Sequence, residues 1–158
     1  MTDIKRLTDS AIASWKQQIS RIDQIVAASS DADLEREIAP GRNRLYYLIG
    51  HLAVVHDRMF PLLGIGERRY PELDKLFLED PDSKTSELPA SDVKRIWSDV
   101  NTRLTAALEQ LEPEVWLTRH NSVSDEDFAK DPLRNRLSVL MNRTGHAAFH
   151  LGQMRLTQ

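Results

Sequence analysis

Four stretches of this chain repeat apolar residues at steps of three and four, and this spacing constrains the fold more than any other feature. The stretches run from Asp3 to Ala28, from Arg44 to Phe60, from Asp92 to Leu111, and from Pro132 toward the C-terminus. Apolar residues at these steps lie along one face of an α-helix, which is buried against a neighbour. We therefore expect an all-α chain that folds as a four-helix bundle.

Prolines punctuate the connections between these stretches. Pro61 is expected to end or kink the second helix, because proline lacks an amide donor and disfavours helix at the preceding residue. Up to Pro89 the periodicity is lost, although Glu72 to Leu78 can form a short helix. This connection is long enough to cross the bundle, so periodicity alone is compatible with both up-down-up-down and up-down-down-up topologies.

The last helix is expected to open at Pro132, because the first turn of a helix tolerates proline. Its core side is predicted to carry Leu133, Leu137, Leu140, Met141, Thr144, Ala148 and Leu151.

The composition indicates a single globular domain over residues 1–158, long enough to bury a sizeable core. The net charge of −3 gives no electrostatic reason to expect a nucleic-acid partner. The absence of cysteine excludes disulfides, zinc-thiolate sites and a cysteine nucleophile. No segment resembles a signal peptide or approaches the roughly 18 apolar residues of a membrane span. We expect a cytoplasmic protein that binds neither nucleic acid nor membrane.

Three of the five histidines are spaced so that they can share one metal ion. His146 and His150 are four residues apart in a helix-compatible segment, which places both imidazoles on one helix face about 5–6 Å apart. A zinc ion usually takes three or four protein ligands, so a third must come from another helix. His51, on the inner face of the second helix, is the best candidate. The alternative is three histidines that only pack and form hydrogen bonds, but burying idle imidazoles is costly.

The other two histidines are expected outside this group. His56 lies five residues after His51, about 140° around the helix axis. It is therefore expected to flank Phe60 or to reach solvent, and His120 is expected on the surface of an irregular segment.

Two polar residues are candidates to orient the ligands from outside. Gln153 lies three residues after His150, and Asn142 lies four residues before His146. Side chains that accept hydrogen bonds from metal-bound histidines fix the orientation of the rings. Three protein ligands leave one position open for water or substrate, which favours a catalytic ion over a structural one.

The spacing of these histidines is similar to that of a known family. A His-x-x-x-His pair at 146–150 precedes Gly152-Gln153, and Gly50-His51-Leu52 lies within the second helix. This combination resembles the DinB-like superfamily of damage-inducible, YfiT-type metalloproteins, over essentially the whole chain. The resemblance implies a four-helix bundle of up-down-down-up topology, often a homodimer, with a divalent metal that is commonly nickel or zinc. The implied ligands are His51, His146 and His150.

Characterised members of that superfamily include thiol-dependent transferases and isomerases that use bacillithiol or mycothiol. The resemblance therefore implies a metal-dependent transferase or hydrolase acting on a small-molecule substrate, for which a low-molecular-weight thiol can serve as cofactor. A non-catalytic bundle that binds a metal or a ligand is the alternative. The sequence identifies no catalytic residue, substrate, native metal or thiol.

Overall fold

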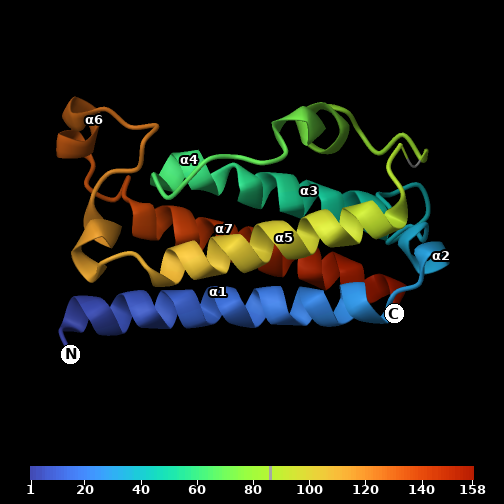
Figure 1. The fold of residues 1–158 in the computed structure, drawn as a ribbon, viewed down its shortest axis with the longest axis horizontal. Coiled ribbons are helices and arrows are strands. Elements are labelled where there is room, and N and C mark those ends of the chain that lie inside the picture. The colour runs from blue at the N-terminus through green and yellow to red at the C-terminus, as the bar shows by residue number, and fades with distance from the viewer. Residues whose placement is uncertain (86) are drawn as a thin grey trace.

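The computed structural model describes residues 1–85 and 87–158, and within these ranges it contains helices and no strand (Figure 1). The all-α prediction is confirmed. The long helices are α1 (Asp3–Ala28), α3 (Leu45–Asp57), α5 (Ala90–Glu109) and α7 (Arg136–Met154). The shorter α-helices are α2 (Asp31–Leu34), α4 (Met59–Leu63) and α6 (Asp125–Lys130). The 3₁₀ helices are η1 (Pro71–Leu73), η3 (Pro113–Leu117) and η4 (Arg155–Thr157), and η2 (Lys75–Glu79) is a π-helix.

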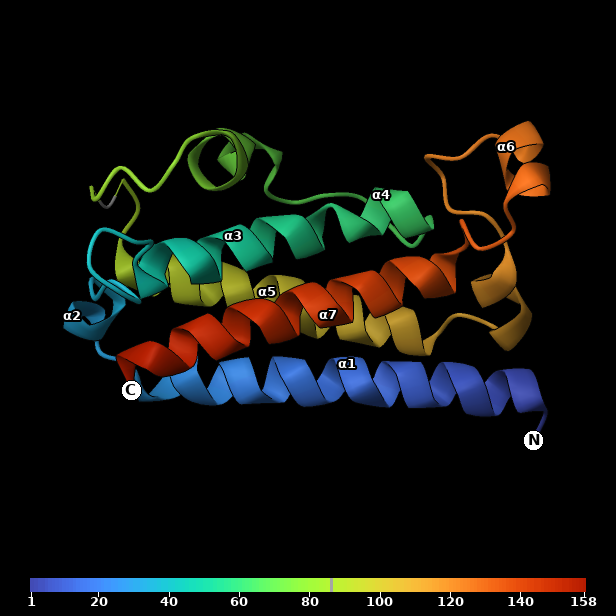
Figure 2. The ribbon, with the colours of Figure 1, turned by 180° about the vertical axis from the view of Figure 1, so that it is seen from behind.

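The four long helices lie side by side, in the order α1, α7, α3 and α5 around the molecule (Figures 1 and 2). Helices α1 and α7 run in one direction, and α3 and α5 run in the other. The chain between α4 and α5 returns along the outer side of α3 and carries η1 and η2. Helix α1 packs extensively on α7, as α3 does on α5, whereas the α3–α7 and α1–α5 seams hold fewer contacts.

Helix α3 is buried on nearly all sides and forms the centre of the core. Eleven of its residues, from Leu45 to Asp57, are buried, and a helix that is apolar all round is stable only when it is enclosed. Trp15 of α1 and Trp97 of α5 are completely buried beside it, and Trp116 of η3 is completely buried as well. The α5, α7 and η2 helices all contact α3.

A buried ion pair fastens the returning segment to the start of α3. The Arg44 and Asp82 side chains are almost fully buried, and Arg44 Nη2 lies 2.7 Å from Asp82 Oδ1. Arg44 Nη1 also donates to Glu35 at 2.5 Å. Arg44 occupies the N-cap position of α3, and its side chain forms this charge pair and does not cap the helix.

Helix α7 begins four residues later than Pro132. The side chain of Asn135 accepts a hydrogen bond from the Ser138 amide at 2.9 Å and so caps the helix at Arg136. The side chain of Asn135 satisfies an amide of the first turn, which would otherwise have no partner. The side chain of a proline has no acceptor atom and cannot do this.

The core side predicted for α7 is only partly correct. Leu140 and Leu151 are buried, but Leu133 and Met141 are 74% and 62% exposed. Leu133 precedes the capped helix start, and Met141 faces solvent because Ala147 and Met154 complete a narrow buried face. The remaining inward face of α7 carries histidines.

His56 lies in the core, so the prediction that it flanks Phe60 or reaches solvent is wrong. Its ring is completely buried and packs edge-on against Trp15, with centroids 4.7 Å apart. Its Nδ1 donates to Asn101 Oδ1 at 2.7 Å, and the Asn101 amide nitrogen donates to the Trp97 carbonyl. Burial lowers the pKa of His56 to about 3. The prediction failed because α3 is enclosed on both faces.

As the pH is lowered, we expect the free energy of unfolding of His56→Gln to fall less steeply than that of the wild type. The folded-state pKa of His56, about 3, lies below the usual value of about 6.5, so its contribution to stability is complete above pH 6.5 and declines as the pH falls toward 3. Between pH 6.5 and 4, the free energy of unfolding of the wild type should fall more steeply than that of the variant, by up to about 1.4 kcal/mol per pH unit. Urea unfolding at several pH values measures both slopes, and equal slopes would contradict this account.

Candidate metal centre

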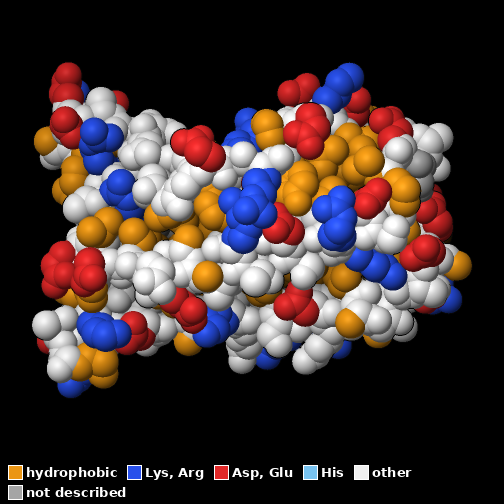
Figure 3. Space-filling view, in the orientation of Figure 1, with side chains coloured by type: hydrophobic (Ala, Val, Ile, Leu, Met, Phe, Trp, Pro, Cys, Tyr) orange, Lys and Arg blue, Asp and Glu red, His pale blue; other side chains and the backbone are white. Residues whose placement is uncertain are grey.

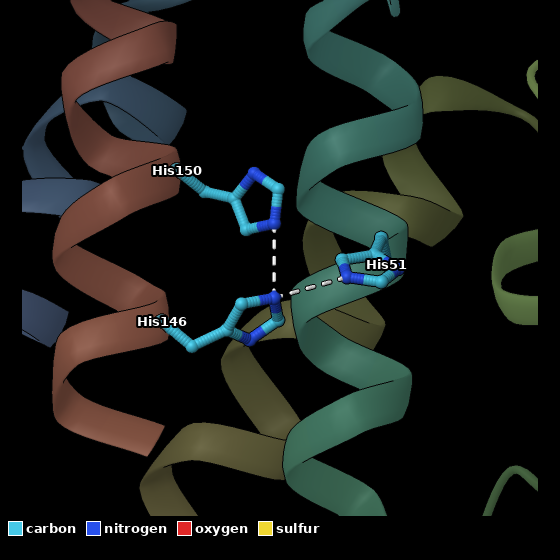
Figure 4. A group of neighbouring side chains, drawn as sticks. All are labelled: His51, His146 and His150. Carbon is cyan, nitrogen blue, oxygen red and sulfur yellow. Dashed lines mark hydrogen bonds between the residues drawn. The ribbon is translucent and has the colours of Figure 1, made fainter. Parts of the chain in front are cut away.

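Three histidine side chains converge at the seam between α3 and α7 (Figure 4). His51 comes from the middle of α3, and His146 and His150 come from consecutive turns of α7. The Nε2 atom of His146 lies 3.4 Å from that of His51 and 3.0 Å from that of His150. One nitrogen of each ring lies within 4.8 Å of the other two, and all three residues are partly exposed.

The spacing of these nitrogens fits a single divalent cation. A tetrahedral ion with nitrogen ligands at about 2.0–2.1 Å separates the ligand atoms by about 3.3–3.4 Å. The two measured separations, 3.0 and 3.4 Å, are close to this value. Imidazole nitrogens are ligands that zinc and nickel accept readily. The residues present therefore suit the group that the sequence indicated.

Two of the three rings are oriented by hydrogen bonds at Nδ1, so that their Nε2 atoms face His146. His51 Nδ1 lies 2.9 Å from the backbone oxygen of Phe77. A carbonyl can only accept, so Nδ1 carries the ring proton. His150 Nδ1 donates to the Gln153 amide oxygen at 2.7 Å. In both neutral rings the unprotonated nitrogen is thus Nε2, the atom that faces the shared centre.

The third ring differs from the other two. His146 Nε2 lies between the Nε2 atoms of His51 and His150, and its Nδ1 is buried with no hydrogen-bond partner. Such a nitrogen is costly in a protein interior. The His146 ring contacts both neighbouring rings, with centroids 5.2 and 4.6 Å away, and its Nε2 lies within hydrogen-bond distance of their Nε2 atoms.

Burial keeps all three rings neutral at physiological pH. It lowers the pKa of His51 and of His150. Burial, followed by the neighbouring His150 and His51, lowers the pKa of His146 to about 4. Arg143 further lowers the pKa of His51 and His146. Neutral imidazole is the form that binds metal ions, so burial leaves the three ligands in the form that a metal requires.

The other candidates lie elsewhere. Asn142 is exposed, and its amide oxygen lies 3.5 Å from Arg143 Nη1. His120 is partly buried in the loop after η3, where its Nδ1 accepts from the Ser122 amide, and it is not one of the clustered histidines.

Sequence reasoning missed the contribution of Phe77, because a backbone carbonyl leaves no trace in a residue pattern. Gly50 is the indirect signal. A Cβ atom at Gly50 would lie 2.3 Å from the Phe77 ring, so only glycine allows η2 to approach α3 this closely. That approach brings the Phe77 carbonyl within reach of His51, the residue after Gly50.

A family model for the DinB superfamily matches residues 14–154. This chain belongs to the DinB superfamily. The match extends from the middle of α1 to the end of α7 and includes all three clustered histidines, so the resemblance in the sequence is confirmed. A comparison with curated proteins found no match for this DinB-superfamily chain. Within the described residues, no helix combines the length and the apolar character that crossing a membrane requires.

We expect Gly50→Ala to destabilise the protein by about 1–3 kcal/mol, the usual cost of overpacking a core. The added methyl group must displace the Phe77 ring, which is itself buried. The matched control is Gly145→Ala, where a Cβ meets nothing within 4 Å, so alanine is expected to be neutral or to stabilise α7 by about 1 kcal/mol. Urea unfolding of both variants tests the difference, and equal stabilities would refute the close approach.

Proposed function

We propose that this DinB-superfamily protein is a divalent-metal-dependent enzyme that acts on a small molecule by group transfer or hydrolysis. The observation that carries the proposal is the convergence of three Nε2 atoms at 3.0 and 3.4 Å. Three neutral nitrogen ligands favour zinc or nickel. The superfamily assignment supports this reading, with a low-molecular-weight thiol as the proposed co-substrate in group transfer.

When bound, a divalent cation supplies Lewis acidity and an open coordination position for water or substrate. The protein contributes the orientation of its ligands, through the Phe77 carbonyl on His51 and the Gln153 amide on His150. All three rings are partly exposed, so the proposed centre is not sealed from solvent.

Aromatic side chains lie next to two of the three histidines. The Tyr47 ring stacks at 6.2 Å on His51, and its hydroxyl donates to the Asp80 carbonyl. The Phe149 ring lies 5.1 Å from His150 and is 63% exposed. These rings offer an apolar surface next to the proposed metal, of the kind that lines small-molecule sites.

Removal of any one ligand is expected to lower metal affinity sharply. We expect His51→Ala, His146→Ala and His150→Ala each to weaken zinc or nickel binding by more than about 100-fold. Loss of a residue that only orients a ligand typically weakens metal binding by about 10- to 100-fold. His120→Ala is the control and should bind as the wild type does. Binding is measured by competition with a chromophoric chelator and by elemental analysis of untagged protein purified without a nickel column. Unchanged affinity in all three variants would end the metal proposal.

Catalysis is tested separately from binding. Metal-loaded wild type and His51→Ala should be assayed side by side for ester and amide hydrolysis and for transfer to small thiols. Turnover in the wild type that is lost in the variant supports the enzyme. Stoichiometric metal without turnover across the panel favours the non-catalytic metal-binding bundle instead.

We also propose that the four helices form the up-down-down-up bundle of the superfamily and that the protein is a homodimer. The exposed Leu7 of α1 and Met141 of α7, with Leu137, line an apolar groove of about 380 Å³, which we call the α1–α7 groove. Large exposed apolar side chains that cluster in this way commonly mark an interface.

Light scattering at high micromolar concentration is expected to give the mass of a dimer. Met141→Glu should shift it to a monomer, because a carboxylate in the α1–α7 groove would have to be desolvated in an interface. Leu156→Glu, which replaces another exposed apolar residue that does not line the α1–α7 groove, is the control. A monomeric wild type would contradict the proposal.

A further inference from the structure

Three arginines gather around a hollow beside the end of α3, and no carboxylate lines it. The hollow has a volume of about 550 Å³ and includes Arg58, Arg68 and Arg143 in its walls. The chain as a whole has more acidic than basic residues, 24 against 21. On the face shown in Figure 3, acidic and basic side chains are interspersed. The hollow therefore departs from the charge pattern of the rest of the chain.

Arg143 is the uncompensated charge in this group. Within the described residues, no salt bridge joins Arg143 to a carboxylate, and its Nε atom is buried without a hydrogen-bond partner. Burial, together with the positive charge of Arg58, lowers its pKa. A partly buried cation without a counter-charge is unfavourable, and a bound anion would remove the penalty.

The other two arginines are held in place by acidic partners outside the hollow. Arg68 Nε lies 3.1 Å from Asp57 Oδ2, and Arg68 also forms a close pair with Asp74. Arg58 lies 3.7 Å from Asp74. These pairs fix the side chains around the hollow and leave Arg143 as the cation available to a ligand.

Among the residues that line the hollow, Arg143 lies nearest in the chain to a clustered histidine. It lies three residues before His146 on α7, and its charge lowers the pKa of both His51 and His146. Arg143 also forms part of a second hollow of about 300 Å³, whose walls include His120 and Arg134 and likewise no carboxylate. Both hollows thus adjoin a positive centre that is electrostatically coupled to the metal-binding cluster.

We propose that Arg143, assisted by Arg58, binds an oxyanion group, a carboxylate or a phosphate, of a small molecule. A guanidinium presents a planar set of donors that matches either group with two parallel hydrogen bonds. This inference rests on the proposed function. The oxyanion is the group of the substrate that Arg143 recognises, and the reacting part of the same molecule faces the histidines. The substrate class is therefore anionic.

The test uses two simple probes, inorganic phosphate and succinate, on the full chain in its metal-free form, so that coordination to a metal cannot account for binding. Isothermal titration calorimetry gives affinities, and the side-chain Nε–H signal of Arg143 in NMR gives the location. We expect the wild type to bind at least one probe, and Arg143→Gln to weaken that binding about 10-fold or more, the loss expected for a charge-assisted contact. Comparison of the two probes tells a phosphate site from a carboxylate site.

Arg21→Gln, the same charge change at an exposed position of α1, is the matched control and should leave binding unchanged. Arg143→Lys keeps the charge without the planar donors and should give an intermediate affinity. Should Arg143→Gln fail to fold, as judged by circular dichroism, Arg58→Gln serves in its place. Failure of both probes to bind the wild type at millimolar concentration, or equal binding by wild type and Arg143→Gln, would overturn the proposal.

Metal affinity of Arg143→Gln, measured in parallel, separates this inference from the proposed function. Zinc binding that survives while phosphate or succinate binding is lost supports both. If probe binding depends on Arg143 but the protein does not bind zinc, the oxyanion site is supported and the metalloenzyme proposal is rejected. If the wild type binds zinc but neither probe, the metal centre is supported and the oxyanion site is rejected.

Discussion

The enclosure of α3 is the constraint on which the rest of this structure depends. Helices α5 and α7 and the returning segment surround it, so nearly every side chain from Leu45 to Asp57 must find a partner inside the protein. His56 meets that demand only in part: it contacts two tryptophans and donates from Nδ1 to Asn101, while its Nε2 has no hydrogen-bond partner. His51 meets it through the Phe77 carbonyl and the histidines of α7. The same burial that stabilises the fold makes the imidazoles neutral, and neutral imidazoles are what a metal requires.

The fold class could be predicted because helical periodicity is a local property of the sequence. The bounds of α1 matched the prediction, whereas the start of α7 did not, because the decisive cap was the side chain of Asn135 and not the nearby Pro132. Met141 shows a second limit. Its spacing suits the core, but only a narrow face of α7 packs inward, and periodicity does not measure the width of that face.

The candidate site could be predicted as far as residue type and helix face determine it. Helical spacing placed His146 and His150 on one face, His51 was the best candidate for a third ligand, and the structure brings the three together. What escaped prediction depends on tertiary packing. The Phe77 carbonyl reaches His51 only because Gly50 admits a neighbouring helix, and the grouping of Arg58 with Arg143 joins residues far apart in the chain. Neither contact follows from a repeat or a motif.

The unequal packing of the bundle has a mechanical consequence. Extensive contacts unite α1 with α7 and α3 with α5, so the molecule consists of two helix pairs joined along two less densely packed seams. One seam contains His51 on one pair and His146 on the other. An ion bound by these residues, as proposed, would crosslink the two halves, and its binding energy would then oppose their separation. Metal binding and separation of the two halves would then be thermodynamically linked.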